Sequence, residues 1–316
     1  MSRVPVQSKC YNKNMKIIKH KLTWIDIINP TKKDIEFIRK QHRFHPIILD
    51  ELLHTSARSR VEPYERYLFM TYHLPIYDRN VKSSRKGEID FLITKDKIIT
   101  VHYEDLEPLN NFWRHLNNDP NFKDRALGEN TGRLAYYIIE EILFFSQRQL
   151  RHIEESVSQL TKELFQGQEG QLLEKISYLK RDILDYNIIS KPQEIILESM
   201  KEVGAKFWGE TMRIYFSDLS GDHLKIMQLL ENFKETVNSL EQTNSQLLNA
   251  KTNAVMKRFT VLAFLTFPMV LFTSMFNVNI FQKYLGENLL VFSVVFFSVL
   301  IFTVSMLIFF RKKGWI

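Results

Sequence analysis

The chain has 316 residues, and 43 Lys and Arg against 36 Asp and Glu give it a formal net charge of +7. The cations are dispersed along the sequence, which argues against a nucleic-acid-binding surface. Cys10 is the only cysteine, so an internal disulfide is excluded and a reducing compartment is favoured. The first twenty residues lack an apolar stretch of the signal-peptide type, and we expect no secretory signal peptide.

The N-terminal part alternates patterns typical of strands and helices. Residues 21–28 and 66–77 predict strands, and residues 88–103 predict a hairpin, because two apolar runs flank a charged turn. The stretch 30–42 predicts a helix with Pro30 near its start, and HPIILDELLHT predicts a second, shorter helix. We therefore expect an α/β domain over residues 1–125.

This domain carries no recognisable catalytic motif. It has no Gly-rich phosphate loop, no His-Glu-x-x-His pair and no nucleophile elbow. His45 and His102 are isolated in the sequence, which favours packing or surface roles over metal ligation. We expect a protein that is not an enzyme and that uses no organic cofactor.

Helical periodicity begins near residue 134. Leu134, Ile138 and Ile142 recur at helical spacing, the pattern continues to Leu164, and residues 171–190 predict another helix. Beyond Gly221 there is no Gly or Pro before Pro268, which predicts a helix of more than 40 residues. At 1.5 Å per residue, such a helix is on the order of 70 Å long. We expect a helical stalk over residues 126–258.

Residues 259–316 have a membrane-type composition. No charge occurs from Phe259 to Gln282, and residues 289–310 form a run of 22 uncharged residues. Such a run covers a hydrocarbon core of about 30 Å. We expect a first transmembrane helix over about 259–280, an outer loop over about 279–288, and a second transmembrane helix over 289–310. The alternative is a pair of buried helices in a soluble core.

The charges that flank the two spans predict their orientation. Lys257 and Arg258 precede the first span, and the basic tail 311–316 contains Arg311, Lys312 and Lys313. The positive-inside rule then places both termini in the cytoplasm of a multi-pass protein of the cell membrane. The bilayer is thus an expected partner, and only the short outer loop, with Lys283 and Glu287, faces outside.

One face of the long helix carries a polar stripe. Its positions follow one another at steps of three and four residues, as in a heptad pattern. Four amides come first, small or apolar residues follow through the span, and another amide ends the series. The stripe consists of Gln242, Gln246, Asn249, Asn253, Met256, Thr260, Ala263, Phe267, Val270, Ser274 and Asn277.

The stripe has two interpretations. An oligomeric coiled-coil seam can contain polar positions that fix register. A water-filled pore lined by one helix from each subunit explains several successive amides better, because amide oxygens can bind the water shell of a cation. This suits Mg²⁺, which gives up its waters reluctantly.

Several motifs resemble those of the CorA-type divalent cation transporter family, over nearly the whole chain. They are TWIDIINPT (23–31), FHPIILDELL (44–53), RVEPYERYLFM (60–70), KTNAVMK (251–257), the mid-span Pro268 and the ending RKKGWI. The resemblance implies an α+β fold with a cytoplasmic α/β domain, long stalk helices and two C-terminal transmembrane helices. It also implies a funnel-shaped homopentamer in which the first transmembrane helix lines the pore.

The resemblance assigns roles at the outer mouth and along the pore. The family's Gly-Met-Asn signature corresponds here to Asn277, Val278 and Asn279, so Asn279 takes the place of the Asn whose ring binds hydrated Mg²⁺. Asn253 and Met256 match pore-facing positions, in agreement with the stripe. Gln242 stands where some relatives carry an acidic ring. Arg311, Lys312 and Lys313 would form a cytoplasmic basic ring.

The resemblance also implies regulation by Mg²⁺ bound between neighbouring cytoplasmic domains, with Asp78 and Asp218 as the carboxylate pair. The expected function is passive influx of a divalent cation, with Mg²⁺ as the expected ion. Transport of Zn²⁺, Co²⁺ or Ni²⁺ is one alternative. The other is a membrane-anchored metal sensor that does not conduct, since the signature motif is altered.

Overall fold

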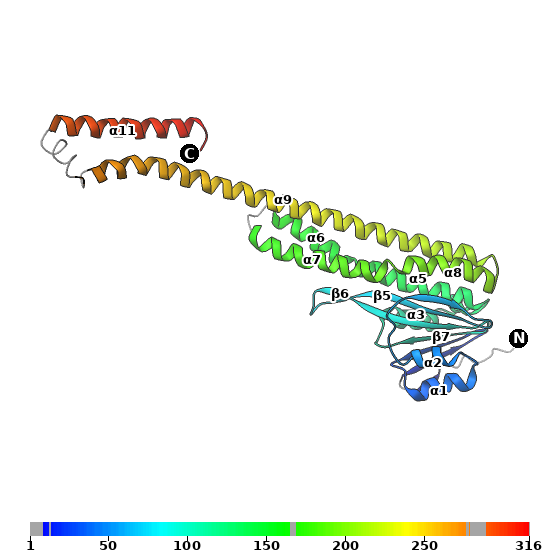
Figure 1. The fold of residues 1–316 in the computed structure, drawn as a ribbon. Coiled ribbons are helices and arrows are strands. Elements are labelled where there is room, and N and C mark those ends of the chain that lie inside the picture. The colour runs from blue at the N-terminus through cyan, green and yellow to red at the C-terminus, as the bar shows by residue number, and fades with distance from the viewer. Residues whose placement is uncertain (1–8, 13, 165–168, 276–277, 279–288, 316) are drawn as a thin grey trace. The chain divides into compact units, whose positions relative to one another are not determined.

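The computed structural model describes residues 9–12, 14–164, 169–275, 278 and 289–315 (Figure 1). The chain divides into two compact units, Met1–Leu240 and Glu241–Ile316. The division falls within one continuous helix, α9 (Met212–Met275). The N-terminal unit holds a mixed sheet with helices on both faces, and the C-terminal unit holds two apolar helices.

The sheet has seven strands in the order β1-β2-β3-β7-β6-β5-β4. Only β3 and β7 are parallel, and every other neighbouring pair is antiparallel. The longest pair is the β5–β6 hairpin, whose register runs from Leu68 opposite Ile93 to Asp78 opposite Ser83. The strands are β1 (Lys9–Asn12), β2 (Met15–Lys19), β3 (Thr23–Ile28), β4 (Arg60–Pro63), β5 (Leu68–Asp78), β6 (Ser83–Ile93) and β7 (Lys97–His102).

Helices α1 (Lys32–Gln41) and α2 (Pro46–Glu51) cover one face of the sheet (Figure 1). Alternate strand residues, such as Ile25 and Ile27, point into an apolar cluster with these two helices. Thr31 begins α1 with a capping box, since its side chain accepts from the Asp34 backbone N–H while the Asp34 carboxylate accepts from the Thr31 N–H.

The other face of the sheet packs against a layer of helices. Trp24 of β3 meets Phe112 edge to face, with ring centroids 5.2 Å apart, and α5 and α7 contact β5. Gly209 follows α8 with φ +112°, a left-handed conformation that glycine adopts readily. The helices are α3 (Glu107–Asn118), α4 (Pro120–Leu127), α5 (Thr131–Gln149), α6 (Arg151–Leu164), α7 (Glu169–Ser190) and α8 (Gln193–Trp208).

A buried polar network joins the two parallel strands. The Trp24 indole N–H donates to Thr100 Oγ1 at 3.0 Å, and the Thr100 hydroxyl donates to Asp26 Oδ1 at 2.6 Å. His102 Nε2 lies 3.2 Å from the same carboxylate oxygen. Burial disfavours the charged imidazole, but the nearby Asp26 carboxylate outweighs this effect and raises the pKa of His102. His102 therefore has the packing role expected from the sequence.

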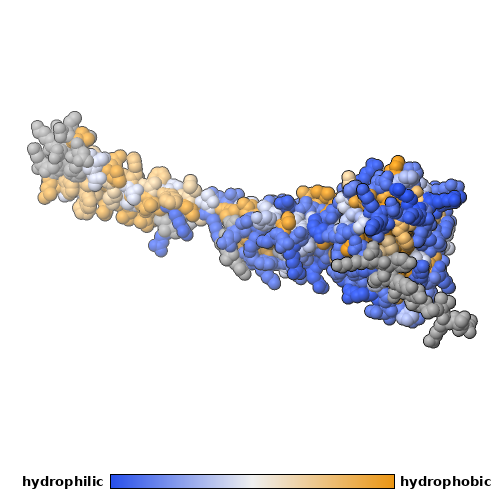
Figure 2. Space-filling model, turned by 90° about the horizontal axis from the view of Figure 1, so that it is seen from below, coloured by the Kyte–Doolittle hydropathy of each residue, from blue (hydrophilic) through white to orange (hydrophobic). Residues whose placement is uncertain are grey.

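The C-terminal unit pairs the end of α9 with α11 (Leu289–Lys312) in antiparallel fashion. Phe264 contacts Phe310, with ring centroids 5.9 Å apart, and Phe272 contacts Phe292 at 5.8 Å. Both helices are long and apolar enough to cross a membrane, and their most apolar windows are only 11% and 0% buried. Figure 2 shows the hydrophobic surface that results. This exposure argues against the alternative of a buried soluble core.

Several elements predicted from the sequence are present. The strands at 23–28 and 68–78, the hairpin of β6 and β7, and helices α1, α2 and α7 lie where periodicity places them. The long helix continues through Gly221 and Pro268 without a break. Helix α11 extends through Lys312, so the first two residues of the expected basic tail lie in its last turn. Strands β1, β2 and β4 and helices α3 and α4 were not predicted.

We expect Thr100→Val to destabilise the N-terminal unit by about 2 kcal/mol, because it leaves the buried Trp24 N–H without its acceptor and removes a hydrogen bond from Asp26. The measurement is the thermal midpoint of the detergent-solubilised chain, followed by tryptophan fluorescence. Thr23→Val, in the same sheet, removes a hydroxyl that makes no hydrogen bond with the described residues. Equal midpoints for the two variants would contradict this role for Thr100.

Candidate functional site

The polar stripe of α9 is exposed in the single chain. Gln242, Gln246, Asn249 and Asn253 are all solvent-exposed, and their amides make no hydrogen bond with any residue that the structure describes. Each side chain carries two donors and an acceptor that remain available. Water, an ion or another copy of the chain can therefore occupy them.

Hydroxyl groups in the apolar part of α9 differ from these amides, because the helix backbone satisfies them. Thr260 donates to the Met256 carbonyl at 2.9 Å, and Ser274 donates to the Leu271 carbonyl at 2.9 Å. Such back-bonding lets Ser and Thr lie in hydrocarbon without an outside partner. The hydroxyls of the stripe therefore do not by themselves require water.

The stripe and the packing face of α9 are different sides of the helix. Val261 and Phe272, which lie off the stripe, are buried against neighbouring parts of the C-terminal unit. Met256 and Phe267, on the stripe, are 60% and 67% exposed. Helix α11 therefore leaves the stripe open along the apolar part of α9.

The expected outer mouth is only partly described. Asn277 and Asn279, and the expected loop 279–288, lie outside the described residues. Val278 is described and is 46% exposed.

Asp78 ends β5 at the tip of the β5–β6 hairpin. Its Oδ1 accepts the backbone N–H of Asn80 at 2.8 Å, and its Oδ2 lies 4.0 Å from Arg85 Nε. Arg85 also pairs with Glu104. Asp78 is thus half-buried in a turn, with a guanidinium beside it.

Asp218 lies on the first turns of α9 and faces α5. The Tyr136 hydroxyl is 2.8 Å from Asp218 Oδ2 and 3.0 Å from Glu140 Oε1, so its single proton can serve only one carboxylate at a time. Burial raises the pKa of Glu140, and the charges of Asp218 and Asp222 raise it further. The result is an acidic patch with less positive compensation than Asp78 has.

Within the chain, the structure does not bring Asp78 and Asp218 together. The hairpin tip and the start of α9 lie at opposite ends of the helical layer of the N-terminal unit (Figure 1). No group of three or more His, Cys, Asp or Glu side chains among the described residues has the arrangement of a metal site. Tyr136 and Glu140 were not among the residues predicted from the sequence, although their spacing of four residues places both on one face of a helix.

Arg311 and Lys312 occupy the last turn of α11, and Lys313 follows. The Lys313 ammonium lies 5.6 Å from the ring centre of Phe309 and 5.5 Å from that of Trp315. None of the three cations forms an ion pair within the described part of the chain. They make one end of α11 strongly positive.

The family model described as "CorA-like Mg2+ transporter protein" matches residues 19–312. The chain belongs to this family. Its members are ion transporters rather than enzymes, and the CorA family match identifies the chain as a membrane transporter for divalent cations. The α/β N-terminal unit, the long helices and the two C-terminal apolar helices form the CorA fold.

Similar proteins support this assignment. The chain is 24% identical over 301 residues to the cobalt/magnesium transport protein CorA of Thermotoga maritima, covering 93% of this chain and 83% of the relative. It is 22% identical over 298 residues to the protein of the same name from Methanocaldococcus jannaschii, with 94% and 92% covered.

Solved structures share the fold. The complete structure of the CorA magnesium transporter from Methanocaldococcus jannaschii matches with a TM-score of 0.81 at 20% identity and covers 100% of both chains. The ZntB cytoplasmic domain from Vibrio parahaemolyticus matches with a TM-score of 0.56 at 14% identity, over 73% of this chain and 90% of that one.

The acidic patch leads to a pH-dependent prediction. Because the folded-state pKa of Glu140 is raised, its contribution to stability is fully present below its unfolded pKa and is lost as pH rises through the folded value. Glu140→Gln removes this loss and keeps an oxygen to accept from Tyr136. We expect the thermal midpoint of the variant to gain on that of the parent as the pH rises above 4.5, the ordinary pKa of a glutamate side chain.

The matched control is Glu155→Gln, an exposed acid on α6 that forms no side-chain hydrogen bond or ion pair with the described residues. It should shift the midpoint equally at each pH. If the thermal midpoints of Glu140→Gln and of the parent differ by the same amount at every pH, the inferred repulsion on Glu140 is contradicted.

Proposed function

We propose that the chain is one subunit of a homopentameric channel that admits hydrated Mg²⁺ into the cell. The observation that carries this proposal is the exposed polar stripe of α9, whose four amides have no partner among the described residues. Five copies arranged with their stripes inward would enclose a water-filled axis. Asn253, Met256, Thr260 and Phe267 would then form the narrow section.

Amides suit a hydrated divalent cation. Mg²⁺ holds its waters tightly, so a pore that strips them must replace six strong bonds at octahedral geometry. Amide oxygens can instead accept hydrogen bonds from the water shell and leave the ion's own bonds intact. An amide also carries no charge, so the ion is recognised without being trapped. By this argument, Asn277, Val278 and Asn279 form the selectivity filter, with Asn279 at its ring.

The apolar surface of the N-terminal unit supports an oligomer. Ile188, Ile195 and Ile214 are 61%, 70% and 74% exposed in the single chain. Exposed apolar side chains of this size on α7, α8 and α9 are candidates for burial against another molecule. Subunit packing would cover these residues and would also turn the stripes towards a common axis.

The basic residues support the orientation with both termini inside. Lys257, Arg258, Arg311, Lys312 and Lys313 all flank the same end of the two apolar helices, which the positive-inside rule assigns to the cytoplasm. We propose that residues 1–125 form the cytoplasmic domain, 126–258 the stalk and 259–316 the transmembrane domain. The membrane potential then drives influx by about 4.6 kcal/mol per divalent ion for each 100 mV.

Asp78 and Asp218 can serve as a regulatory pair only between neighbouring subunits, because they lie apart within one chain. We propose that cytoplasmic Mg²⁺ bridges them and offsets the repulsion in the Asp218 patch. Burial raises the pKa of Glu140 in this patch, and the charges of Asp218 and Asp222 raise it further. Bound Mg²⁺ would hold the subunits in a closed arrangement. Depletion would release them.

Co²⁺ is a second candidate ion, because two of the similar proteins carry the name cobalt/magnesium transport protein. The stripe offers amides, hydroxyls and one thioether at Met256, and no Cys or His. Softer transition metals prefer imidazole and thiolate, so the donor set favours Mg²⁺. A non-conducting sensor would bind metal without passing it.

We expect Asn279→Ala to reduce Mg²⁺ uptake by about tenfold or more, since each lost hydrogen bond to an ion's shell costs about 1.5–3 kcal/mol. Uptake is measured with a trapped magnesium dye in proteoliposomes under a potassium diffusion potential. Asn232→Ala, at an exposed position of α9 before the stripe, is the control. Unchanged flux in Asn279→Ala would remove the filter assignment, and metal binding without flux in the parent protein would favour the sensor.

We expect Asp218→Asn to conduct at internal Mg²⁺ concentrations that close the parent channel. Asn keeps an oxygen to accept from Tyr136, so the variant removes charge while it preserves the contact. Glu235→Gln, an exposed acid on the same helix, should close normally. The readout is dye-reported influx at graded internal Mg²⁺. Identical closure in both variants would exclude Asp218 from regulation.

A further inference from the structure

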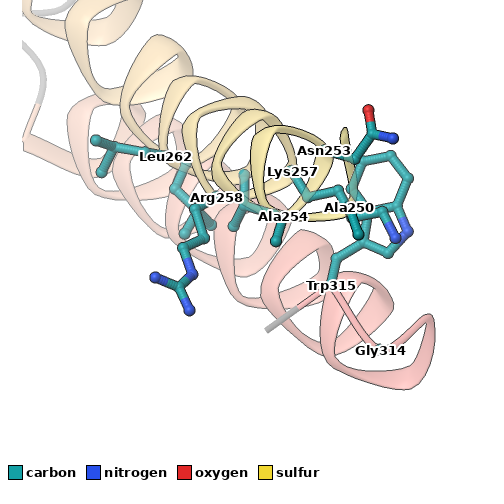
Figure 3. A pocket seen from close by; sticks show the side chains of 10 residues that line it. Ala250, Asn253, Ala254, Lys257, Arg258, Leu262, Gly314 and Trp315 are labelled. Carbon is teal, nitrogen blue, oxygen red and sulfur yellow. The ribbon is translucent and has the colours of Figure 1, made fainter. Parts of the chain in front are cut away.

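A cavity of 830 Å³ lies between α9 and the residues that follow α11 (Figure 3). Lys257 and Arg258 form its charged wall, Val261, Leu262 and Leu265 form its apolar wall, and Trp315 borders it from the C-terminal segment. All of these residues belong to the C-terminal unit. The cavity combines cations, an aromatic ring and aliphatic side chains.

The positive charge around this cavity is uncompensated. Lys257 and Arg258 form no ion pair within the described part of the chain. The sequence contains no Asp or Glu from residue 242 to 286 or from 288 to 316. Arg311, Lys312 and Lys313 add further positive charge near the same segment. Solvent, a dissolved anion or a lipid headgroup can therefore supply the counter-charge.

The cavity changes character along α9. Val261 and Leu265 follow Lys257 by one and two helical turns, so the wall passes from cationic to aliphatic within about 6–12 Å. A phospholipid has the same profile, with a phosphate at the membrane surface and acyl chains below it. A small soluble anion has no apolar part that could contact the aliphatic side chains of the wall.

Trp315 marks the level of the membrane surface. Its ring stacks on Phe310, with centroids 5.6 Å apart, and Lys313 lies over it. Tryptophan favours the headgroup region because its ring is apolar and its N–H can donate. The indole is therefore held where a lipid phosphate or glycerol could accept from it.

This cavity is distinct from the polar stripe. Of the residues that line it, only Asn253 belongs to the stripe. At 100° per residue, Val261 and Leu265 are rotated by about 80° and 120° from Asn253 around α9. The cavity therefore opens on another face of the helix than the one proposed to line the pore.

We propose that this cavity binds an anionic phospholipid of the cytoplasmic leaflet, with the headgroup phosphate near Lys257 and the Trp315 N–H and with Arg258 as a second cation on the same segment of α9. The acyl chains lie along Val261, Leu262 and Leu265. Basic pockets between membrane helices on the cytoplasmic side are suited to such headgroups. The proposal needs membrane insertion with this end inside, but it does not depend on conduction or on the identity of the ion.

The test measures quenching of Trp315 fluorescence in vesicles. The full-length protein is reconstituted in phosphatidylcholine that contains either brominated phosphatidylglycerol or brominated phosphatidylcholine, with the bromines on the upper acyl chain. The same protein carrying Trp315→Phe supplies the background from the other tryptophans. We expect phosphatidylglycerol to quench Trp315 preferentially. Lys257→Gln and, separately, Arg258→Gln should each lower that preference about fivefold, from about 1 kcal/mol per cation.

Lys251→Gln is the matched control, because it removes the same charge from the same helix but does not line the cavity. It should leave the preference unchanged. Equal quenching by the two lipids, or an equal effect of Lys251→Gln and Lys257→Gln, would overturn the proposal. Absence of quenching by either lipid would mean that a neighbouring subunit fills the cavity. Loss of the preference on adding millimolar inorganic phosphate would assign the site to a soluble anion.

Discussion

The exposed amides of helix α9 need hydrogen-bond partners, and the proposal for the C-terminal unit depends on what supplies them. Helix α9 carries exposed amides up to Asn253 and then continues as a segment apolar enough to cross a membrane. Thr260 and Ser274 donate to carbonyls of their own helix, whereas the stripe amides Gln242, Gln246, Asn249 and Asn253 make no hydrogen bond with the described residues. The proposed pore would supply these amides with water, and the proposed oligomer and hydrated ion depend on the same interaction.

The N-terminal unit meets part of this requirement internally. In the sheet, the Trp24–Thr100–Asp26 chain links buried polar groups of two adjacent strands. Other buried atoms, such as His42 Nε2 and His223 Nε2, have no hydrogen-bond partner among the described residues. Asp218 lies on the exposed surface of α9, where another subunit or an ion could act.

Much of the fold could be predicted from periodicity. The apolar residues at 68–78 are typical of a strand, and the run without Gly or Pro after Gly221 is typical of a long helix. Strand β5 and helix α9 lie at these positions. Strands β1 and β2 were missed because they are short and contain several polar residues, and they gain stability from pairing with each other and, for β2, with β3 rather than from their own pattern. Helix α4 has only eight residues, and its cap at Asp119 is a local signal that periodicity does not contain.

The candidate site was predictable where it depends on one helix and was not where it depends on contacts between helices. The stripe follows from the spacing of residues on α9 alone. Tyr136 and Glu140 meet Asp218 only because α5 packs beside α9, and Trp315 meets Lys257 only across the C-terminal hairpin. Such contacts depend on how distant segments align against one another, and the spacing of residues within one segment does not specify that alignment.

Asp218 and Glu140 share the single hydroxyl of Tyr136, so at most one of the two carboxylates can accept its proton at a time. If the patch binds a divalent cation as proposed, a proton and the cation would each neutralise part of the same negative charge and would compete for the patch. Such a patch would respond to pH and to metal concentration in the same way. A lower cytoplasmic pH would then favour the proposed closed state as a high metal concentration does, and a higher pH would disfavour it.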